Sequence, residues 1–179
     1  MNEFHEFEYT VTKKSEGAYR IKRILMVGLY VLFGLVYFFG LALAHLYPLM
    51  ALIIFFEWML VFLTWRYVSI EYSYTLISGN MTFYTVYGGK KKKTMLEKRV
   101  KTFSEIRPLG ENEKSELAKR RFSNVYSFIR SENEISDKYF AVFAEDDASE
   151  SIVYFEATQQ TLKILKYYNS NTEITETKC

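Results

Sequence analysis

The chain has 179 residues, of which 49% are hydrophobic and 25% charged, and its formal net charge is +2. This length allows one small folded domain beside any membrane segment, and a charge this close to neutral argues against a nucleic-acid-binding protein. The single cysteine, Cys179, excludes an intrachain disulfide and a zinc site of spaced cysteines, in agreement with a cytoplasmic location.

Two apolar runs follow a short N-terminal segment, residues 1–23, which is expected in the cytoplasm. As helices, Ile24 to Leu46 would measure about 34 Å and Leu49 to Trp65 about 26 Å, against a hydrocarbon core of about 30 Å. The few residues around Pro48 allow only a tight turn, so the sequence predicts a two-helix transmembrane hairpin over residues 24–66. Lysine and arginine flank both runs and are absent between them, which predicts a multi-pass cell-membrane protein with both termini in the cytoplasm.

Two other interpretations of the apolar runs are weaker. Ala42-Leu43-Ala44 has the pattern of a signal-peptide cleavage site, but the run is longer than that of a signal peptide, and glutamates accompany the basic residues before it. Two buried helices of a soluble protein would need more covering chain than the residues after Trp65 obviously supply.

Residues 67–169 carry the pattern of a small sheet domain. Val68 to Leu76 alternates apolar and polar residues, as a half-buried strand does, and Ser78-Gly79-Asn80 then turns the chain into an aromatic strand from Met81 to Tyr87. Further elements are predicted as strands at 94–103, 125–130, 139–144 and 151–155, a short exposed helix or loop at 111–121, and a final amphipathic helix capped by Thr158. The polar residues 170–179 are predicted to be a disordered tail.

Strands followed by one C-terminal helix predict an α+β fold. The expected arrangement is an antiparallel sheet or partly open barrel that the helix closes at one end. Pleckstrin-homology-like domains are built in this way, and so are other small barrels.

Four segments of the chain carry a resemblance to a known family. They are Glu8 to Lys14, Glu71 to Met81 with the aromatic strand and lysine-rich turn that follow, Ser104 to Pro108, and Phe155 to Leu162. Together they resemble a bacterial family of two-helix membrane proteins, domain of unknown function 6106. The resemblance implies a membrane-anchored pleckstrin-homology-like (PH-like) domain and supplies no catalytic activity.

Lys90, Lys91, Lys92 and Lys93 form a basic turn after the second predicted strand. A first strand that leaves the membrane near Tyr67 climbs about 35 Å, and the return strand descends about 23 Å, so the turn comes back toward the bilayer. The four lysines are therefore candidates for lipid-headgroup contact, where each adds about 1 kcal/mol at an anionic surface. The alternative is a solvated turn that keeps a hairpin soluble.

Glu57 lies near the middle of the second apolar run, where a carboxylate is unfavourable and suggests a function. Counting back through the turn places it level with Tyr37, whose hydroxyl is a candidate partner. The alternatives for Glu57 are local pairing, contact with a partner subunit, and proton or ion traffic. Gly40 and Ala44 have the spacing that lets helices pack closely, although small residues are also common in membrane helices.

No catalytic, cofactor or metal site is expected. The chain has two distant histidines and a single cysteine, and it lacks a glycine-rich phosphate loop and a nucleophile elbow. The acidic residues Glu145, Asp146, Asp147 and Glu150 do not have the spacing of an EF-hand and are interpreted as a hairpin loop.

The sequence thus predicts a noncatalytic scaffold or adaptor at the inner leaflet of the cell membrane. Its expected partners are the lipid bilayer, with anionic lipids as candidates, and either a membrane-protein partner or a second copy of the chain in a homo-oligomer. No nucleic acid is expected. An accessory subunit of a membrane transport or secretion complex is the alternative function, and an enzyme with an unrecognised site is a third.

Overall fold

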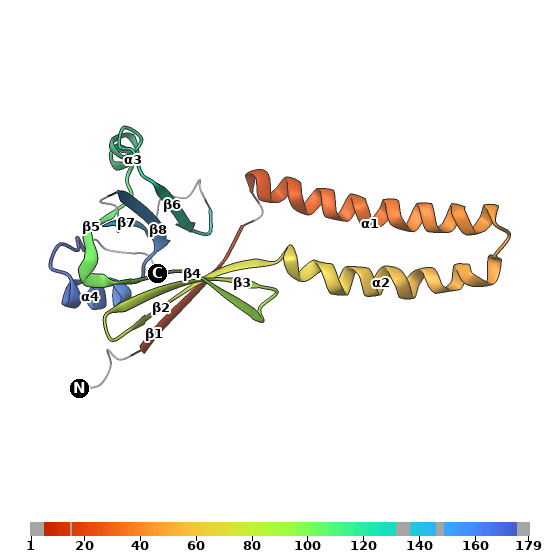
Figure 1. The fold of residues 1–179 in the computed structure, drawn as a ribbon, viewed down its shortest axis with the longest axis horizontal. Coiled ribbons are helices and arrows are strands. Elements are labelled where there is room, and N and C mark those ends of the chain that lie inside the picture. The colour runs from red at the N-terminus through yellow and green to blue at the C-terminus, as the bar shows by residue number, and fades with distance from the viewer. Residues whose placement is uncertain (1–5, 15, 132–136, 146–148, 175–179) are drawn as a thin grey trace. The chain divides into compact units, whose positions relative to one another are not determined.

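The computed structural model describes residues 6–14, 16–131, 137–145 and 149–174 (Figure 1). Within these residues the chain divides into two compact units. The helical unit comprises Lys14–Ile70 together with the turn Tyr87–Lys91, and the sheet unit comprises the other described residues.

The helical unit is a pair of helices that run side by side in opposite directions (Figure 1). Its elements are α1 (Gly17–Leu43), the 3-10 helix η1 (Tyr47–Leu52), α2 (Ile53–Thr64) and the 3-10 helix η2 (Trp65–Tyr67). By length and composition, Tyr19–Leu43 and Tyr47–Tyr67 are each able to cross a membrane. The two predicted apolar helices are therefore present, and the first begins earlier than the sequence predicts.

Three tyrosines of α1 connect the two helices. Tyr19, Tyr30 and Tyr37 lie on one side of α1 because close to whole numbers of helical turns separate them. The Tyr30 hydroxyl is 2.7 Å from the Thr64 hydroxyl, and the Tyr37 hydroxyl donates to the Leu49 carbonyl oxygen at 3.3 Å. The Tyr19 hydroxyl bonds to the backbone just after η2, where it donates to one carbonyl and accepts one amide N–H.

Most of the other large apolar side chains of the helical unit face outward. No residue of α2 is buried, and Ile54 is 77% exposed. Burial of apolar surface away from water stabilises a protein by about 25 cal/mol per Å², and these side chains do not gain that stabilisation while they face water. Within the described residues, the helical pair therefore leaves most of its apolar surface uncovered.

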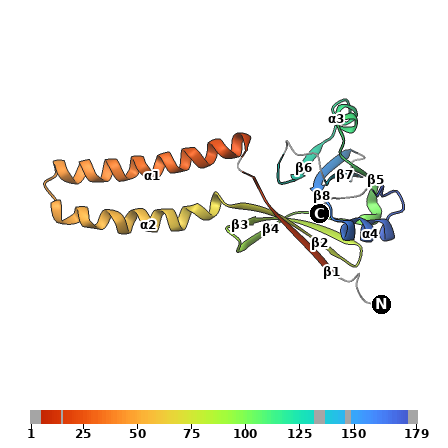
Figure 2. The same cartoon turned by 180° about the vertical axis from the view of Figure 1, so that it is seen from behind.

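The sheet unit contains two four-stranded sheets and two helices (Figures 1 and 2). The first sheet has the order β1 (Glu6–Thr12), β2 (Ile70–Ile77), β3 (Asn80–Tyr87) and β4 (Lys91–Arg99). The second has the order β5 (Phe103–Pro108), β7 (Lys138–Ala144), β8 (Glu150–Glu156) and β6 (Asn124–Phe128). The helices are α3 (Glu111–Leu117) and α4 (Gln159–Tyr168), and a 3-10 turn, η3 (Val100–Thr102), joins the two sheets.

Two features of this topology differ from the sequence-based prediction. The predicted strand at 94–103 is broken by η3, so its first part lies in one sheet and its last residue starts a strand of the other. Buried Val100 sits in η3 and continues the apolar pattern across the break. In addition, β6 pairs with β8 in parallel, so the second sheet is not purely antiparallel.

Strand β1 comes from the predicted N-terminal segment and belongs to the sheet unit. It pairs with β2 in antiparallel register from Glu6↔Ile77 to Thr12↔Glu71. The alternation of Phe7, Tyr9 and Val11 with polar residues is the sequence signal for this strand. The apolar helices are consequently inserted between the first two strands of one sheet.

The main core of the sheet unit lies between the two sheets and α4, and Tyr74 links all three. Its hydroxyl donates to the Glu156 carbonyl oxygen at 2.9 Å and lies 2.9 Å from the Thr161 hydroxyl, in the first turn of α4. Burial raises the pKa of the Tyr74 hydroxyl. Thr158 and Thr161 form a capping box that starts α4, as the sequence predicts for Thr158.

The chain stays packed beyond α4, where the sequence predicts a disordered tail. The Asn169 side-chain amide donates to the carbonyl oxygens of Val100 and Phe103, at 2.9 and 2.8 Å. Thr172 is 1% exposed and bridges to Ile106 of β5. The disorder prediction therefore does not hold for residues 170–174, and 175–179 lie outside the described residues.

Replacing the helical hairpin with a short linker is expected to leave the sheet unit folded and soluble. Because Thr12 and Glu71 are direct partners, a Gly/Ser linker of about four residues from Lys13 to Glu71 can join β1 to β2 as a hairpin. Gel filtration without detergent and a cooperative thermal melt check this outcome.

The matched control is a chain that begins at Glu71 and therefore lacks β1. It loses the seven-residue strand and the packing of Tyr9 on Tyr74, whose rings are 5.7 Å apart, so it is expected to aggregate or to melt at a lower temperature. Equal stability of the two proteins would contradict the assignment of β1 to this domain.

Candidate functional site

The lysine-rich turn between β3 and β4 returns to the end of the apolar helices. Gly88 and Gly89 both have positive φ, 59° and 69°, and the Gly88 amide donates to the Ser69 carbonyl oxygen at 2.9 Å. A Cβ atom built on Gly88 would lie 2.7 Å from the Cβ of Arg66. The turn therefore lies directly against Arg66, within the helical unit.

Basic and aromatic side chains are paired at this end of the helical hairpin. The Arg66 guanidinium lies 4.9 Å from the ring centroid of Tyr67 and donates to its hydroxyl at 3.0 Å. Arg23 of α1 lies 5.6 Å from the ring centroid of Trp65. The lysines at 90 and 91 are exposed. Paired cations and aromatic rings of this kind are typical of residues at the water–lipid boundary.

The second half of the basic turn belongs to the sheet unit, and one of its lysines is already engaged. Lys92 forms an ion pair with Glu8 of β1, and the Ser73 hydroxyl donates to the same carboxylate at 3.0 Å. The Lys92 hydrogen bond, and then that of Ser73, lower the pKa of the Glu8 carboxyl. Lys93 is exposed, and within the described residues neither it nor the lysines at 90 and 91 form an ion pair.

Glu57 faces α1, but beside Gly34 rather than Tyr37. A Cβ atom on Gly34 would lie 3.1 Å from the Glu57 Oε2 atom, so the missing side chain at Gly34 makes room for the carboxylate. Tyr37 instead bonds to Leu49 and packs its ring 6.0 Å from that of Phe56. The predicted pairing of Tyr37 with Glu57 is corrected accordingly.

The 3-10 helix η1 accounts for this difference in position. Its six residues rise about 3 Å more than the same residues would in an α-helix, so Glu57 lies level with an earlier residue of α1 than a simple residue count gives.

Gly40 and Ala44 do not pack within the helical hairpin. No atom lies within 4 Å of a Cβ built on Gly40, and Ala44 is exposed at the end of α1. On α2, an open apolar groove of about 460 Å³ is lined by Ile53, Ile54, Glu57, Trp58 and Val61. Close packing at Gly40 and Ala44 is thus available only to a partner outside the hairpin.

The predicted acidic loop lies only partly within the described residues, because Asp146 and Asp147 are outside them. Glu145 accepts a hydrogen bond from the Asn124 side chain at 2.8 Å, and Glu150 accepts one from Arg120 at 2.9 Å. The described part of the chain contains no group of three His, Cys, Asp or Glu side chains that could hold a metal ion.

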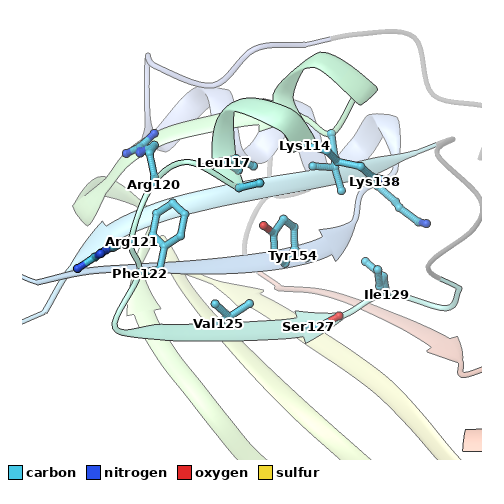
Figure 3. Close-up of a pocket in the computed structure, with 12 residues that line it drawn as sticks. Lys114, Leu117, Arg120, Arg121, Phe122, Val125, Ser127, Ile129, Lys138 and Tyr154 are labelled. Atoms are coloured by element: carbon cyan, nitrogen blue, oxygen red, sulfur yellow. The ribbon is translucent and has the colours of Figure 1, made fainter. Parts of the chain in front are cut away.

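A further candidate, which the sequence does not predict, is a cleft in the sheet unit (Figure 3). Its volume is about 1010 Å³, and its described lining comes from α3, β6, β7, β8 and adjoining loops. The lining residues are Leu109, Lys114, Leu117, Ala118, Arg120, Arg121, Phe122, Val125, Ser127, Ile129, Lys138 and Tyr154. They include four cationic side chains and, within the described residues, no acidic one.

Arg120 fixes one rim of this cleft. Its guanidinium pairs with Glu105 of β5 and with Glu150 of β8, and these hydrogen bonds, that of Glu105 first, raise the pKa of Arg120. The same guanidinium lies 5.3 Å from the ring centroid of Phe122. On the floor of the cleft, partial burial raises the pKa of the Tyr154 hydroxyl. The cleft therefore combines apolar side chains with fixed positive charge.

A comparison with family models assigns most of the chain. The model described as a bacterial PH-like domain (DUF6106) matches residues 2–174, which include every described helix and strand. No curated protein and no solved structure matches the chain.

Replacing Gly88 with alanine is expected to destabilise the basic turn by about 2 kcal/mol or more. The substitution combines the strain of positive φ, about 1 kcal/mol, with a clash against the Arg66 backbone and Cβ. Gly89→Ala is the matched control, because Gly89 also has positive φ but no atom lies within 4 Å of its Cβ position. Thermal unfolding of the full chain in nanodiscs measures the difference, and equal effects of the two substitutions would contradict the Arg66 contact.

Proposed function

Because the chain belongs to the bacterial PH-like domain family DUF6106, we propose that it is a noncatalytic adaptor held at the inner leaflet of the cell membrane by α1 and α2. Both termini lie in the cytoplasm, and the PH-like domain presents its surface to cytoplasmic partners. The noncatalytic role is proposed from the family type.

The observation that carries this proposal is the insertion of the apolar helices between β1 and β2. The two strands pair directly, so the chain leaves and re-enters the sheet at one place. A segment that crosses a bilayer under this constraint has to return to the side on which it started. Two outward-facing apolar helices joined by a tight turn satisfy that requirement.

Anionic lipid headgroups are the proposed ligands of the basic turn. The turn packs against Arg66, at the end of the second apolar helix, and Arg23 and Trp65 lie at the same end of the hairpin. Each lysine near an anionic surface contributes about 1 kcal/mol within a Debye length of about 8 Å. Lys92 contributes least, because Glu8 neutralises it.

The native Cys179 allows a direct test of orientation. A membrane-impermeant maleimide is expected to label it in inverted vesicles but not in intact spheroplasts, since the C-terminus is proposed to be cytoplasmic. In a Cys179→Ser background, His45→Cys in the turn between the helices is expected to show the opposite pattern. Labelling of both positions from the same side would contradict the transmembrane hairpin.

Neutralising the free lysines of the turn is expected to lower the preference for anionic lipid. The substitution Trp58→Phe leaves Trp65 as the only tryptophan. Quenching of its fluorescence is measured with brominated phosphatidylglycerol and with brominated phosphatidylcholine, and the ratio of the two reports which lipid is enriched around Trp65. Gln at the lysines numbered 90, 91 and 93 is expected to reduce this preference by about fivefold or more. A fivefold change is about 1 kcal/mol in total, below the sum of about 3 kcal/mol that three lysines at an anionic surface contribute at most.

The matched control carries Gln at three exposed lysines outside the turn, Lys101, Lys119 and Lys163, and changes the net charge equally. It is expected to keep the wild-type preference. If both triple variants lost the preference to the same extent, the effect would come from net charge and the proposed headgroup site would be wrong.

A second candidate function is an accessory subunit of a membrane transport or secretion complex. The observation that favours it is the open groove beside Glu57, together with the unfilled space at Gly40. A partner helix in this position could approach closely and donate a hydrogen bond to the carboxylate.

Under this alternative, Gly40→Ile and Glu57→Gln are expected to shift the native complex to a smaller size on native gels, since each removes part of the docking face. Gly28→Ile is the control, because Gly28 also has open space at its Cβ position but lies on a different side of α1. Unchanged complex size for both test variants would remove this function.

A further inference from the structure

The second sheet of the PH-like domain has one face that the described residues cover incompletely. The inner face, with Ala141, Phe143 and Phe155, belongs to the main core. On the outer face, Phe140, Val142 and Ile152 are buried with Leu109 and Leu117 in a second, smaller cluster. The outer face is therefore apolar over several strands and depends on α3 for its cover.

Helix α3 is too short to complete that cover. It has seven residues and ends at Leu117, after which the chain runs without a helix to β6. Val125 of β6 is the register partner of buried Ile152, so it lies on the same face, yet it is 62% exposed. Tyr154, the partner of Ser127, is only partly buried. The cleft in Figure 3 is this uncovered part of the sheet face.

Positive charge lies at both ends of the cleft. Figure 3 shows Arg120 and Arg121 at one end and Lys114 and Lys138 at the other, with the Tyr154 ring between them. Carboxylates already hold Arg120. Arg121 and Lys114 are exposed and form no ion pair within the described residues.

We propose that this cleft binds a small organic anion with an apolar body, such as an aromatic or aliphatic carboxylate or sulfonate. The apolar body lies on Tyr154 and Val125 beside the Phe122 ring, and the acidic head pairs with Arg121 or Lys114. A volume of about 1010 Å³ is ample for such a ligand, since ligand pockets typically measure about 300–1000 Å³. A neutral ligand would leave Arg121 and Lys114 without a counter-charge, so charge complementarity selects the anion.

A matched pair of probes tests the proposal on the full chain in phosphatidylcholine nanodiscs. Naphthalene-2-sulfonate and naphthalene-2-sulfonamide share an apolar body and differ in charge. The methyl resonances of Leu117, Val125 and Ile129, which line the cleft, are expected to shift saturably with the sulfonate, while those of Ile174, outside it, stay unchanged. The sulfonamide is expected to bind about tenfold more weakly, because it lacks a charge-assisted hydrogen bond.

Variants separate the cleft from general charge effects. Arg121→Gln and Lys114→Gln are each expected to weaken sulfonate binding, together by about tenfold or more, and Val125→Trp to block it by filling the floor. Lys163→Gln on α4, outside the cleft, is expected to leave sulfonate binding unchanged.

Two results would overturn the proposal. Equal binding of the sulfonate and the sulfonamide would indicate an apolar occupant, such as a lipid chain or a peptide side chain. The absence of saturable shifts at Leu117 and Val125 would show that the cleft does not bind the sulfonate, and neither result would bear on the membrane anchor.

Discussion

The antiparallel pairing of β1 with β2 is the constraint on which the rest of the structure depends. β1 precedes the apolar helices and β2 follows them, yet the two strands are neighbours over seven register pairs, from Glu6 with Ile77 to Thr12 with Glu71. The segment between them is in effect a very long hairpin loop. The entropic cost of closing a loop rises only slowly with the length of the loop. A helical pair can therefore be inserted here, provided that its two ends lie close together.

The two units of the chain are stabilised in different ways. The sheet unit buries aromatic side chains between its sheets, and Tyr74 joins both sheets to α4 through hydrogen bonds that are shielded from water. The helical unit buries almost nothing apolar and is held by tyrosine hydroxyls along one side of α1. In an apolar medium, contact between two apolar side chains is scarcely more favourable than contact of each side chain with lipid. Hydrogen bonds between helices therefore contribute a larger share of the stability there. The pattern of contacts in the hairpin thus suits lipid surroundings better than water.

The elements that the sequence predicts correctly are those whose pattern is local. The apolar runs and the strands around Tyr74, Phe140 and Val153 follow from hydrophobic length and period-two alternation alone. What the sequence does not reveal is pairing between distant segments. β1 is short and its partner lies beyond the helices, and Thr172 looks like part of a polar tail until its contact with Ile106 is known. Counting residues back through the turn places Glu57 level with Tyr37, because the count assumes the rise of an α-helix and the sequence does not reveal the larger rise of the 3-10 helix η1.

The cleft could not be found from sequence, because its lining comes from several segments whose individual patterns are those of ordinary surface and core residues. Its physical origin is nevertheless simple. A sheet face that is apolar across β6, β7 and β8 needs a long helix to cover it, and α3 supplies one side chain, Leu117, to the buried cluster. The ion pairs of Arg120 then hold the segment that carries Phe122 at the rim, so the floor stays open while the rim is fixed. A cleft with a fixed rim loses little conformational entropy when a ligand enters, which favours binding over collapse of the chain onto the exposed floor.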